Sequence, residues 1–437
     1  MIIDNAQQLK TLKGRDVLLH PIPLDDRLHP SCTSIIAFGI IDVNTKESFI
    51  VSKAHPEGVF QVTDLSFLTQ KIYTTNRALL LSNGFQEFDY DLEMLHYLRT
   101  NKGYEVHQSP MVSLYNRTLS KCFKTNALID LIKLEEQTTE LYNNCFSPDH
   151  PDGLAFYSNT LKQSLIKVQQ NGIKIDVDKF QEVFGKSFAL NGDMCYTQYN
   201  FYTTTGRPSN RFGGINFAAL PKEDNTRECF ISRFEDGVLL ELDFNSYHPR
   251  LIADIIGYNF GDADVYSHLA QHYHNTDQPT KAQIVQAKED TFRQLYGGIR
   301  KEYLSIPFFQ ATDAFSKEIW KHMQEYGYVD SLISGRRLMI ANYKDITEHT
   351  LFNYYIQMYE TETNAKVLTK IHEYLDTNSM QSIPILYTYD SILFDVPLSE
   401  FELLTKQMIP HCIDTEQFPV KLKRGNNYKN ISFYDII

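Results

Sequence analysis

The stretch VLLELDFNSYHPR, residues 238–250, joins an apolar run to an acidic turn. Its first part is rich in aliphatic residues and predicts a strand that ends near Asp243. Pro249 closes the turn that follows, so the Asp243 carboxylate is expected at the tip of the strand, open to solvent or to a metal ion. A second run, IPILYTYDSILFDV at residues 383–396, places Asp390 between two apolar arms and predicts a β-hairpin with an acid at its apex.

Two carboxylates on rigid, adjacent strands are what phosphoryl transfer by two divalent ions requires, because the ions lie about 3.5–4 Å apart and are held jointly. Asp243 and Asp390 are candidates for such a pair. An acid at a strand end is more often a turn former, however. The pairing therefore needs a third feature to support it.

That feature is a helix expected to begin near Pro279 and to end at the glycine pair 297–298. Along it Lys288, Phe292 and Tyr296 recur every four residues and form one stripe. A cation beside two aromatic rings fits a site where Lys holds a triphosphate and Tyr stacks on a base. The alternative is a core face over which the lysine stem extends, which is the commoner arrangement for an isolated stripe.

The composition is that of a globular protein with a net charge of -12: 437 residues, 42% hydrophobic and 22% charged. The excess of acid argues against a protein that coats nucleic acid with its whole surface, but it permits a locally basic channel. The six cysteines form no C-x-x-C pair, which argues against a zinc site and a disulfide framework. No apolar run reaches the roughly 20 residues of a membrane span, and the N-terminal residues have no signal-peptide core, so a cytoplasmic protein with no membrane partner is expected.

Breaks in the pattern predict three segments. Residues 1–147 alternate short apolar runs with turns and then show helical spacing, which predicts a mixed α/β domain. Pro, Asp and Gly concentrate at residues 147–153 and mark a linker, so residues 148–202 are assigned to a linker and a short helical part. Residues 203–437 form one long mixed α/β unit that carries the acidic strands.

Across residues 154–437 the chain resembles the family A DNA polymerases, because six motifs occur in the family's order. Each motif alone is weak, and together they are specific. The matching segments are TGRPS at 205–209 with NFAALP at 216–221, DFNS at 243–246, K-x3-F-x3-YG at 288–297, N-x3-Q at 353–357, YDS at 389–391 with FDVP at 394–397, and GNNY at 425–428.

The resemblance implies an α/β architecture with an α+β palm. It implies a polymerase right hand of palm (residues 203–437), fingers inserted at about residues 255–335 and a reduced thumb (148–202). A ribonuclease H-like domain of the exonuclease type (1–147) would precede it. The implied activity is template-directed addition of deoxynucleoside triphosphates to the 3′ end of a primer, with primer-template DNA as partner.

The resemblance also implies roles for single residues. Asp243 and Asp390, with the backbone carbonyl of Phe244, would hold two Mg²⁺ ions, and Lys288 would neutralise charge that develops on the triphosphate. Minor-groove acceptors common to every base pair would let polar side chains check the geometry of the primer and template. The residues expected to contact nucleotide, primer or template are Tyr296, Phe292, Arg207, Asn353 and Gln357.

Three positions depart from the family pattern. Ile284 stands four residues before Lys288, where the family has an Arg. Lys281 is the candidate to replace that Arg in contacting the outer phosphates of the nucleotide. His248 stands where the family has a Glu that acts as a barrier to the ribose 2′-hydroxyl. An imidazole is bulky and can bond Tyr296, but it carries no fixed negative charge, which leaves sugar selection open. Ser391 stands where a further carboxylate is usual.

The thumb and the N-terminal domain are reduced relative to the family. Only about 27 residues separate Asp176 from Thr203, too few for a long helical thumb, so we expect low unaided processivity or a partner that supplies the grip. The first strand continues as HPI at residues 20–22 where the family nuclease has Asp-x-Glu, and Asn83 with Asp89 match a second nuclease motif only loosely. We therefore expect a degenerate, inactive 3′-to-5′ exonuclease-like domain.

Three functions stay open at this point. The leading one is a compact DNA-directed DNA polymerase. Its small size suggests that it belongs to a phage or another mobile element, and it would then act in the cytoplasm of the host cell. The second is an inactive primer-template-binding paralogue, because Ile284, His248 and Ser391 all depart from the pattern near the site. The third is a polymerase with relaxed choice between ribose and deoxyribose, which His248 motivates.

A basic strip near the C-terminus is expected to be a solvated face, with a DNA-backbone contact as the alternative: Lys421, Lys423, Arg424 and Lys429.

Overall fold

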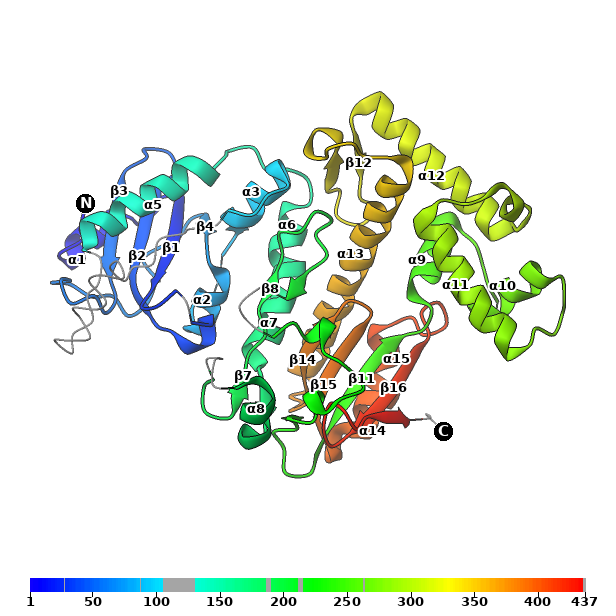
Figure 1. Ribbon diagram of the computed structural model, residues 1–437. Helices are drawn as coiled ribbons and strands as arrows, with labels where there is room; N and C mark the ends of the chain where they lie inside the picture. The colour runs from blue at the N-terminus through cyan, green and yellow to red at the C-terminus, as the bar shows by residue number, and fades with distance from the viewer. Residues whose placement is uncertain are drawn as a thin grey trace. The chain divides into compact units, whose positions relative to one another are not determined.

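The chain forms two compact units (Figure 1). One consists of Met1–Gln170 and Lys186–Gln198, the other of Asn171–Gly185 and Tyr199–Ile437. Residues 148–170, assigned from the sequence to the linker and thumb, therefore belong to the first unit. The computed structural model describes residues 1–26, 28–86, 88–104, 130–185, 190–210, 215–261 and 264–434.

The first unit is built on a mixed five-stranded sheet in the order β3-β2-β1-β4-β5. β1 pairs antiparallel with β2 and parallel with β4, which gives the mixed α/β character expected from the sequence. β2 is buried along its whole length, as its unbroken aliphatic run indicates. The strands are β1 Val17–Pro23, β2 Ile35–Asp42, β3 Ser48–Ser52, β4 Ile72–Thr74 and β5 Tyr90–Asp91, and a short strand β7, Met194–Cys195, also belongs to this unit.

Helix α5, Leu131–Cys145, packs against β2 and β3 of this sheet (Figure 1). Gly39 permits the close approach, because a Cβ at that position would lie 2.1 Å from the hydroxyl oxygen of Thr138. The other helices of the unit are α1 Ala6–Lys10, α2 Arg77–Ser82, α3 Leu92–Thr100, α6 Leu154–Phe156, the π-helical turn η2 Tyr157–Lys162 and α7 Gln163–Asn171.

Buried ion pairs hold the segment after residue 148 in the first unit. The Lys162 ammonium lies 2.7 Å from an Asp91 carboxylate oxygen and 2.6 Å from one of Glu93. The Arg77 guanidinium donates to the carbonyl of Ser158 at 2.6 Å. A charge as deeply buried as Lys162 is tolerated only with such partners, so η2 is fixed to β5 and α3.

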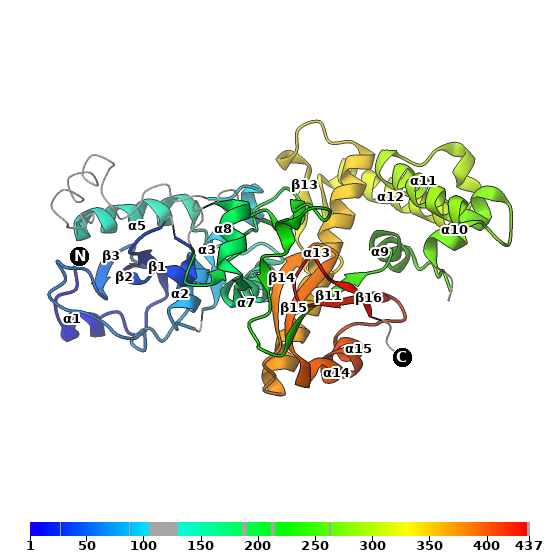
Figure 2. The same cartoon turned by 60° about the horizontal axis from the view of Figure 1, so that its bottom comes forward.

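The second unit contains an antiparallel five-stranded sheet in the order β14-β15-β11-β16-β17. Figures 1 and 2 both place the long helix α13, Glu348–Thr377, beside the β14–β15 part of this sheet. The predicted strand at 238–244 and the predicted hairpin at 383–396 are both present. The strands are β11 Gly237–Phe244, β14 Ile383–Thr388, β15 Ser391–Pro397, β16 Val420–Gly425 and β17 Ser432–Tyr434.

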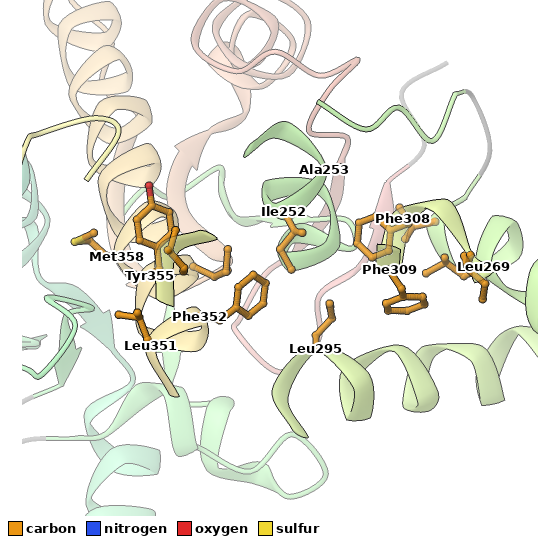
Figure 3. Close-up of a cluster of buried hydrophobic side chains, with 14 of the residues drawn as sticks. Ile252, Ala253, Leu269, Leu295, Phe308, Phe309, Leu351, Phe352, Tyr355 and Met358 are labelled. Carbon is orange, nitrogen blue, oxygen red and sulfur yellow. The ribbon is translucent and has the colours of Figure 1, made fainter. Parts of the chain in front are cut away.

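A helical part lies between β11 and the β14–β15 hairpin in the sequence, and its helices share one hydrophobic core (Figure 3). Ile252 of α9, Leu269 of α10, Leu295 of α11, Phe308 of α12 and Phe352 of α13 all point into this core. Burial of these apolar side chains holds the helices against one another. The helices are α9 Tyr247–Ile256, α10 Val265–His274, α11 Lys281–Gly297 and α12 Pro307–Tyr326.

Helix α11 begins slightly later than the sequence indicates. Pro279 was expected at the first helical position, but Thr280 caps the helix in a reciprocal pair with Gln283, so the proline lies outside it. The end at the glycine pair is as expected. Gly298 has φ +93° and a Cβ there would lie 2.6 Å from the ring of His349, so both the backbone and the space require glycine.

The remaining elements of the second unit are short. The strands are β6 Ile173–Ile175, β8 Tyr199–Asn200, β9 Ser209–Asn210, β10 Phe230–Ile231, β12 Tyr328–Asp330 and β13 Arg337–Met339, and the helices are α8 Val177–Phe184, α14 Phe401–Leu403, η8 Leu404–Met408 and α15 Ile409–Cys412. Among the described residues, no helix combines the length and the apolar character that crossing a bilayer requires.

Candidate active site

Asp243 and Asp390 lie at the same end of two neighbouring strands. In the β11–β15 ladder Asp243 is paired with Ser391, the residue after Asp390. The backbone N–H of Phe244 donates to the carbonyl of Asp390 at 2.9 Å, which closes the ladder at this end. Tyr389 adopts φ +60° in the hairpin turn, a left-handed conformation that turns the chain at this point. The sheet therefore brings together two acids that are 147 positions apart in the sequence.

The two carboxylates influence each other. Asp390 is exposed as a residue, yet its neighbours partly desolvate the carboxylate, and this desolvation together with the charge of Asp243 raises the pKa of Asp390 above its ordinary value. Among the described residues no cluster of three or more His, Cys, Asp or Glu side chains could hold a metal ion.

Lys423 supplies a positive charge beside the pair. Its ammonium lies 3.2 Å from a carboxylate oxygen of Asp243 and 2.7 Å from one of Glu241, which faces it across the β11–β16 ladder. Desolvation opposes the charge of Lys423, but the bonds to Glu241 and Asp243 outweigh it and raise the pKa of the lysine. Lys423 is thus an ion-paired residue at the acidic end of β11, and the expectation of a solvated face is wrong for it.

A buried polar network fixes the turn between β11 and α9. Tyr247, the first residue of α9, donates its hydroxyl to the side-chain oxygen of Asn364 at 2.6 Å. The amide of Asn364 donates in turn to the carbonyl of Tyr389 at 2.8 Å and to the hydroxyl of Tyr387 at 3.0 Å. Asn364 of α13 therefore ties the turn after Asp243 to the turn that carries Asp390.

Glu360, one turn earlier on α13, joins three of the predicted site residues. It is fully buried, and its carboxylate accepts from Arg207 at 3.1 Å and lies 3.3 Å from Nε2 of His248. Nδ1 of His248 is hydrogen-bonded to the hydroxyl of Tyr296. Burial alone would raise the pKa of Glu360, but the partners His248 and Arg207 lower it below its ordinary value, so the group is a carboxylate.

Arg207 is held above the hairpin turn. Its guanidinium carbon lies 3.8 Å from the ring centroid of Tyr389, next to Asp390, and its Nε lies 2.8 Å from Glu360. The turn before it is closed by a bond from the Thr203 hydroxyl to the carbonyl of Arg207 at 2.8 Å. Arg207 therefore occupies a fixed position beside the acidic pair.

The stripe on α11 is part core and part open surface. Phe292 packs against the core of the helical part and stacks on Tyr296, with ring centroids 5.8 Å apart and an angle of 4°. Tyr296 is 36% exposed, and Lys288 is exposed with its ammonium 5.8 Å from the ring centroid of Tyr266. Both sequence interpretations of the stripe are thus partly realised, because one ring packs and the other two side chains face outward.

The other predicted positions lie on α11 and α13. The amide of Asn353 donates to the carbonyl of Tyr296 at 3.4 Å. Gln357, one turn later, accepts from the hydroxyl of Thr205 at 3.1 Å. Lys281 is exposed in the first turn of α11, and Ile284 packs against the core of the helical part.

The sequence reasoning missed Glu360, Asn364 and Glu241. A signal for the first two was present, because positions 353, 357, 360 and 364 continue one stripe on α13 at spacings of three and four. Glu241 gave no such signal, because an acid two residues before Asp243 on the same strand is indistinguishable from a solvent-facing residue until its cross-strand partner is known.

Sequence comparison finds relatives among the bacterial DNA polymerases I. No family model matches the chain. DNA polymerase I of Bacillus subtilis (strain 168) is 24% identical over 254 residues, which cover 50% of this chain and 28% of that protein. DNA polymerase I of Streptococcus pneumoniae serotype 4 is 25% identical over 222 residues, which cover 43% of this chain and 25% of that protein. The chain thus matches only about a quarter of the length of these relatives.

The fold is similar to that of a solved polymerase domain. The POL domain of Pol1 from M. smegmatis, in a complex with DNA primer-template and dNTP, superposes with a TM-score of 0.69 at 13% sequence identity. The superposition covers 97% of this chain and 98% of the other. The expected fold class, a mixed α/β chain with the architecture of a polymerase domain, is therefore confirmed.

Proposed function

We propose that this chain, which is related in sequence and fold to the family A DNA polymerases, is a DNA-directed DNA polymerase that extends a primer with deoxynucleotides. One observation carries the proposal. The β11 and β15 strands place Asp243 and Asp390 side by side, close enough for one charge to raise the pKa of the other carboxyl. The names of the relatives and of the structural neighbour support the same activity.

The donor set at this end of the sheet fits magnesium. Asp243, Asp390 and the carbonyl of Phe244 offer hard oxygen ligands, and two like charges held together favour a divalent cation. These residues would hold two Mg²⁺ ions. The ions, when bound, supply charge neutralisation at the phosphates and acidify the attacking hydroxyl. The ion pair with Lys423 would orient the Asp243 carboxylate at this end of the sheet.

The chain's own side chains bind and orient the reactants in this proposal. Lys288, exposed above the ring of Tyr266, would neutralise the triphosphate. Tyr296, which is 36% exposed, would lie near the templating base. Arg207, fixed beside Asp390, and the polar side chains of Asn353 and Gln357 would contact primer and template in the minor groove.

Primer extension tests this function directly. The purified chain is incubated with a labelled primer-template, Mg²⁺ and either deoxynucleotides or ribonucleotides. Extension with deoxynucleotides supports the proposal, and equal extension with ribonucleotides identifies the polymerase of relaxed sugar choice instead. Binding of the primer-template without any extension identifies the inactive paralogue.

The first unit is proposed to be an inactive nuclease-like domain. His20 occupies the place of the expected metal-binding acid, is bonded to Thr75 at 2.6 Å, and has its pKa lowered to about 4 by burial. The residues of the loose second motif serve the fold, since Asn83 accepts from the backbone of Ile35 and Asp89 from that of Ile72. No open set of carboxylates is formed by these residues.

We therefore expect no shortening of a labelled primer from its 3′ end when Mg²⁺ is present and nucleotides are omitted. The measurement uses the Asp243→Asn variant beside the wild type, so that any nuclease activity of the first unit is separated from that of the second. Metal-dependent shortening at equal rates in both proteins would contradict the proposal.

Low processivity is proposed on the same basis. Between Asp176 and Thr203 the described residues contain one helix, the eight-residue α8, which spans about 12 Å and offers few phosphate contacts. With an excess of unlabelled trap DNA we expect products only a few nucleotides longer than the primer. Long products under trap conditions would show that the chain needs no partner to hold the duplex.

A further inference from the structure

Glu360 on α13 is a buried charge to which the proposed chemistry gives no task. Its side chain has 0% exposed surface, and it meets Arg207 and His248, which arrive from two other segments. A carboxylate removed from water is costly unless its partners compensate. Glu360 contacts two site residues directly and reaches Tyr296 through His248, which points to a positioning role.

Glu360 sets the direction of the hydrogen bonds through His248. A carboxylate can only accept, so the Nε2 that faces Glu360 is the nitrogen that carries a hydrogen. In a neutral ring Nδ1 is then an acceptor, and it accepts from the hydroxyl of Tyr296. The order Tyr296 to His248 to Glu360 locks both rings in one arrangement.

The locked rings stand where the sugar of a bound nucleotide would lie. His248 is on the first turn of α9, five residues after Asp243, and Tyr296 is two turns after Lys288 on α11. A nucleotide whose phosphates lie between Lys288 and the two acids, and whose base lies at Tyr296, has its ribose beside His248. A ring held there limits the space at the 2′ position.

We propose that Glu360 is the positioning residue for sugar selection: it holds His248 against Tyr296, so that this pair of rings rejects a ribose 2′-hydroxyl. The inference rests on the proposed function. The family resemblance implies a glutamate at position 248. Here position 248 is a histidine, and the carboxylate of Glu360 on α13 contacts the imidazole of that histidine. The negative charge missing from α9 is thus supplied by α13.

The test compares kcat/KM for deoxynucleotides with kcat/KM for ribonucleotides in the Glu360→Gln variant. Glutamine keeps the shape but removes the charge and lets the side chain donate, so the preferred order of hydrogen bonds is lost. We expect the ratio to fall by about tenfold, as for a loosened pocket. A ratio equal to that of the wild type overturns the inference.

Glu362→Gln is the matched control. Glu362 is also fully buried on α13, but its carboxylate is bonded to the hydroxyls of Ser331 and Ser334, away from His248. A merely structural loss lowers kcat/KM for both sugars alike and leaves the ratio unchanged, and this is the result expected for Glu362→Gln. A fall of the ratio in the control equal to that in Glu360→Gln overturns the inference.

His248→Phe keeps the bulk of a ring, removes both hydrogen bonds, and leaves the ion pair of Glu360 with Arg207 in place. We expect the same loss of the ratio, and no further loss when Glu360→Gln is added. An undiminished ratio in His248→Phe, or additive losses in the double variant, overturns the inference. If the wild-type protein extends a primer with neither kind of nucleotide, the proposed function itself is refuted. If the wild type extends a primer selectively with deoxynucleotides, the proposed function stands whatever the Glu360 and His248 variants show.

Discussion

Primer extension by the Asp243→Asn and Asp390→Asn variants is expected to fall by about 10³-fold or more, which corresponds to about 4 kcal/mol of lost transition-state stabilisation. Each substitution removes one of the two carboxylates that meet at this end of the β11–β15 ladder and keeps the size of the side chain. Single-turnover extension of a labelled primer at saturating nucleotide measures the loss. Activity within tenfold of the wild type in both variants would contradict the assignment.

The thermal stability of the same variants separates a functional pair from a structural one. The folded state raises the pKa of Asp390, so its ionised form opposes folding above that pKa, and the penalty disappears as the pH falls through it. At pH 8 without divalent ions, Asp390→Asn should therefore have a Tm equal to or above that of the wild type. Titration with Mg²⁺ should raise the Tm of the wild type but not that of the variant.

Asp243→Asn differs in one respect that provides an internal check. Lys423 contacts Asp243 as well as Glu241, so loss of the Asp243 charge removes a favourable ion pair together with the repulsion from Asp390. Its Tm without divalent ions should lie below that of Asp390→Asn. The reverse order would show that Lys423 does not support the acidic pair.

Local patterns in the sequence sufficed for the strands and for the acids at their ends. Apolar runs broken at Asp243 and at Asp390 determine where β11 ends and where the β14–β15 hairpin turns, because both features depend on neighbouring residues alone. The α11 stripe followed from helical spacing in the same way. Its start was misplaced because Pro279 and the capping Thr280 both mark a helix beginning, and the reciprocal bond with Gln283 decides between them.

The stripe on α13 marked the positions of Glu360 and Asn364, but the long-range polar contacts that they make could not be predicted from the sequence. Glu360, Asn364 and Glu241 are buried acids or amides whose partners lie on other elements, and a single acidic letter does not reveal whether it faces solvent or an arginine 153 positions away. The same holds for Lys162, whose two carboxylate partners assign η2 to the first unit rather than to a linker. These residues become interpretable only when the fold has paired them.

The second large effect is expected for Lys288→Ala, with kcat/KM for deoxynucleotides lowered by about 10²–10³-fold, the range for loss of one stabilising donor. Lys288 is exposed on α11, and its nearest described aromatic contact is the ring of Tyr266, so its removal leaves the core of the helical part intact. Steady-state extension at varied nucleotide concentration measures it. Lys321→Ala on α12, also exposed, is the control, because it changes the net charge equally and should leave kcat/KM within about twofold.

The division between kcat and KM then distinguishes the two lysines of α11. Lys281 lies seven residues before Lys288, two turns away or about 10 Å along the helix, so it can reach only the outer phosphates. A contact with phosphates that change little during the reaction contributes equally to the ground state and the transition state. Lys281→Ala should therefore raise KM severalfold with kcat preserved, whereas Lys288→Ala should lower kcat itself. An unchanged KM in Lys281→Ala would mean that nothing on α11 replaces the arginine that Ile284 displaces, and that Lys288 binds the triphosphate alone.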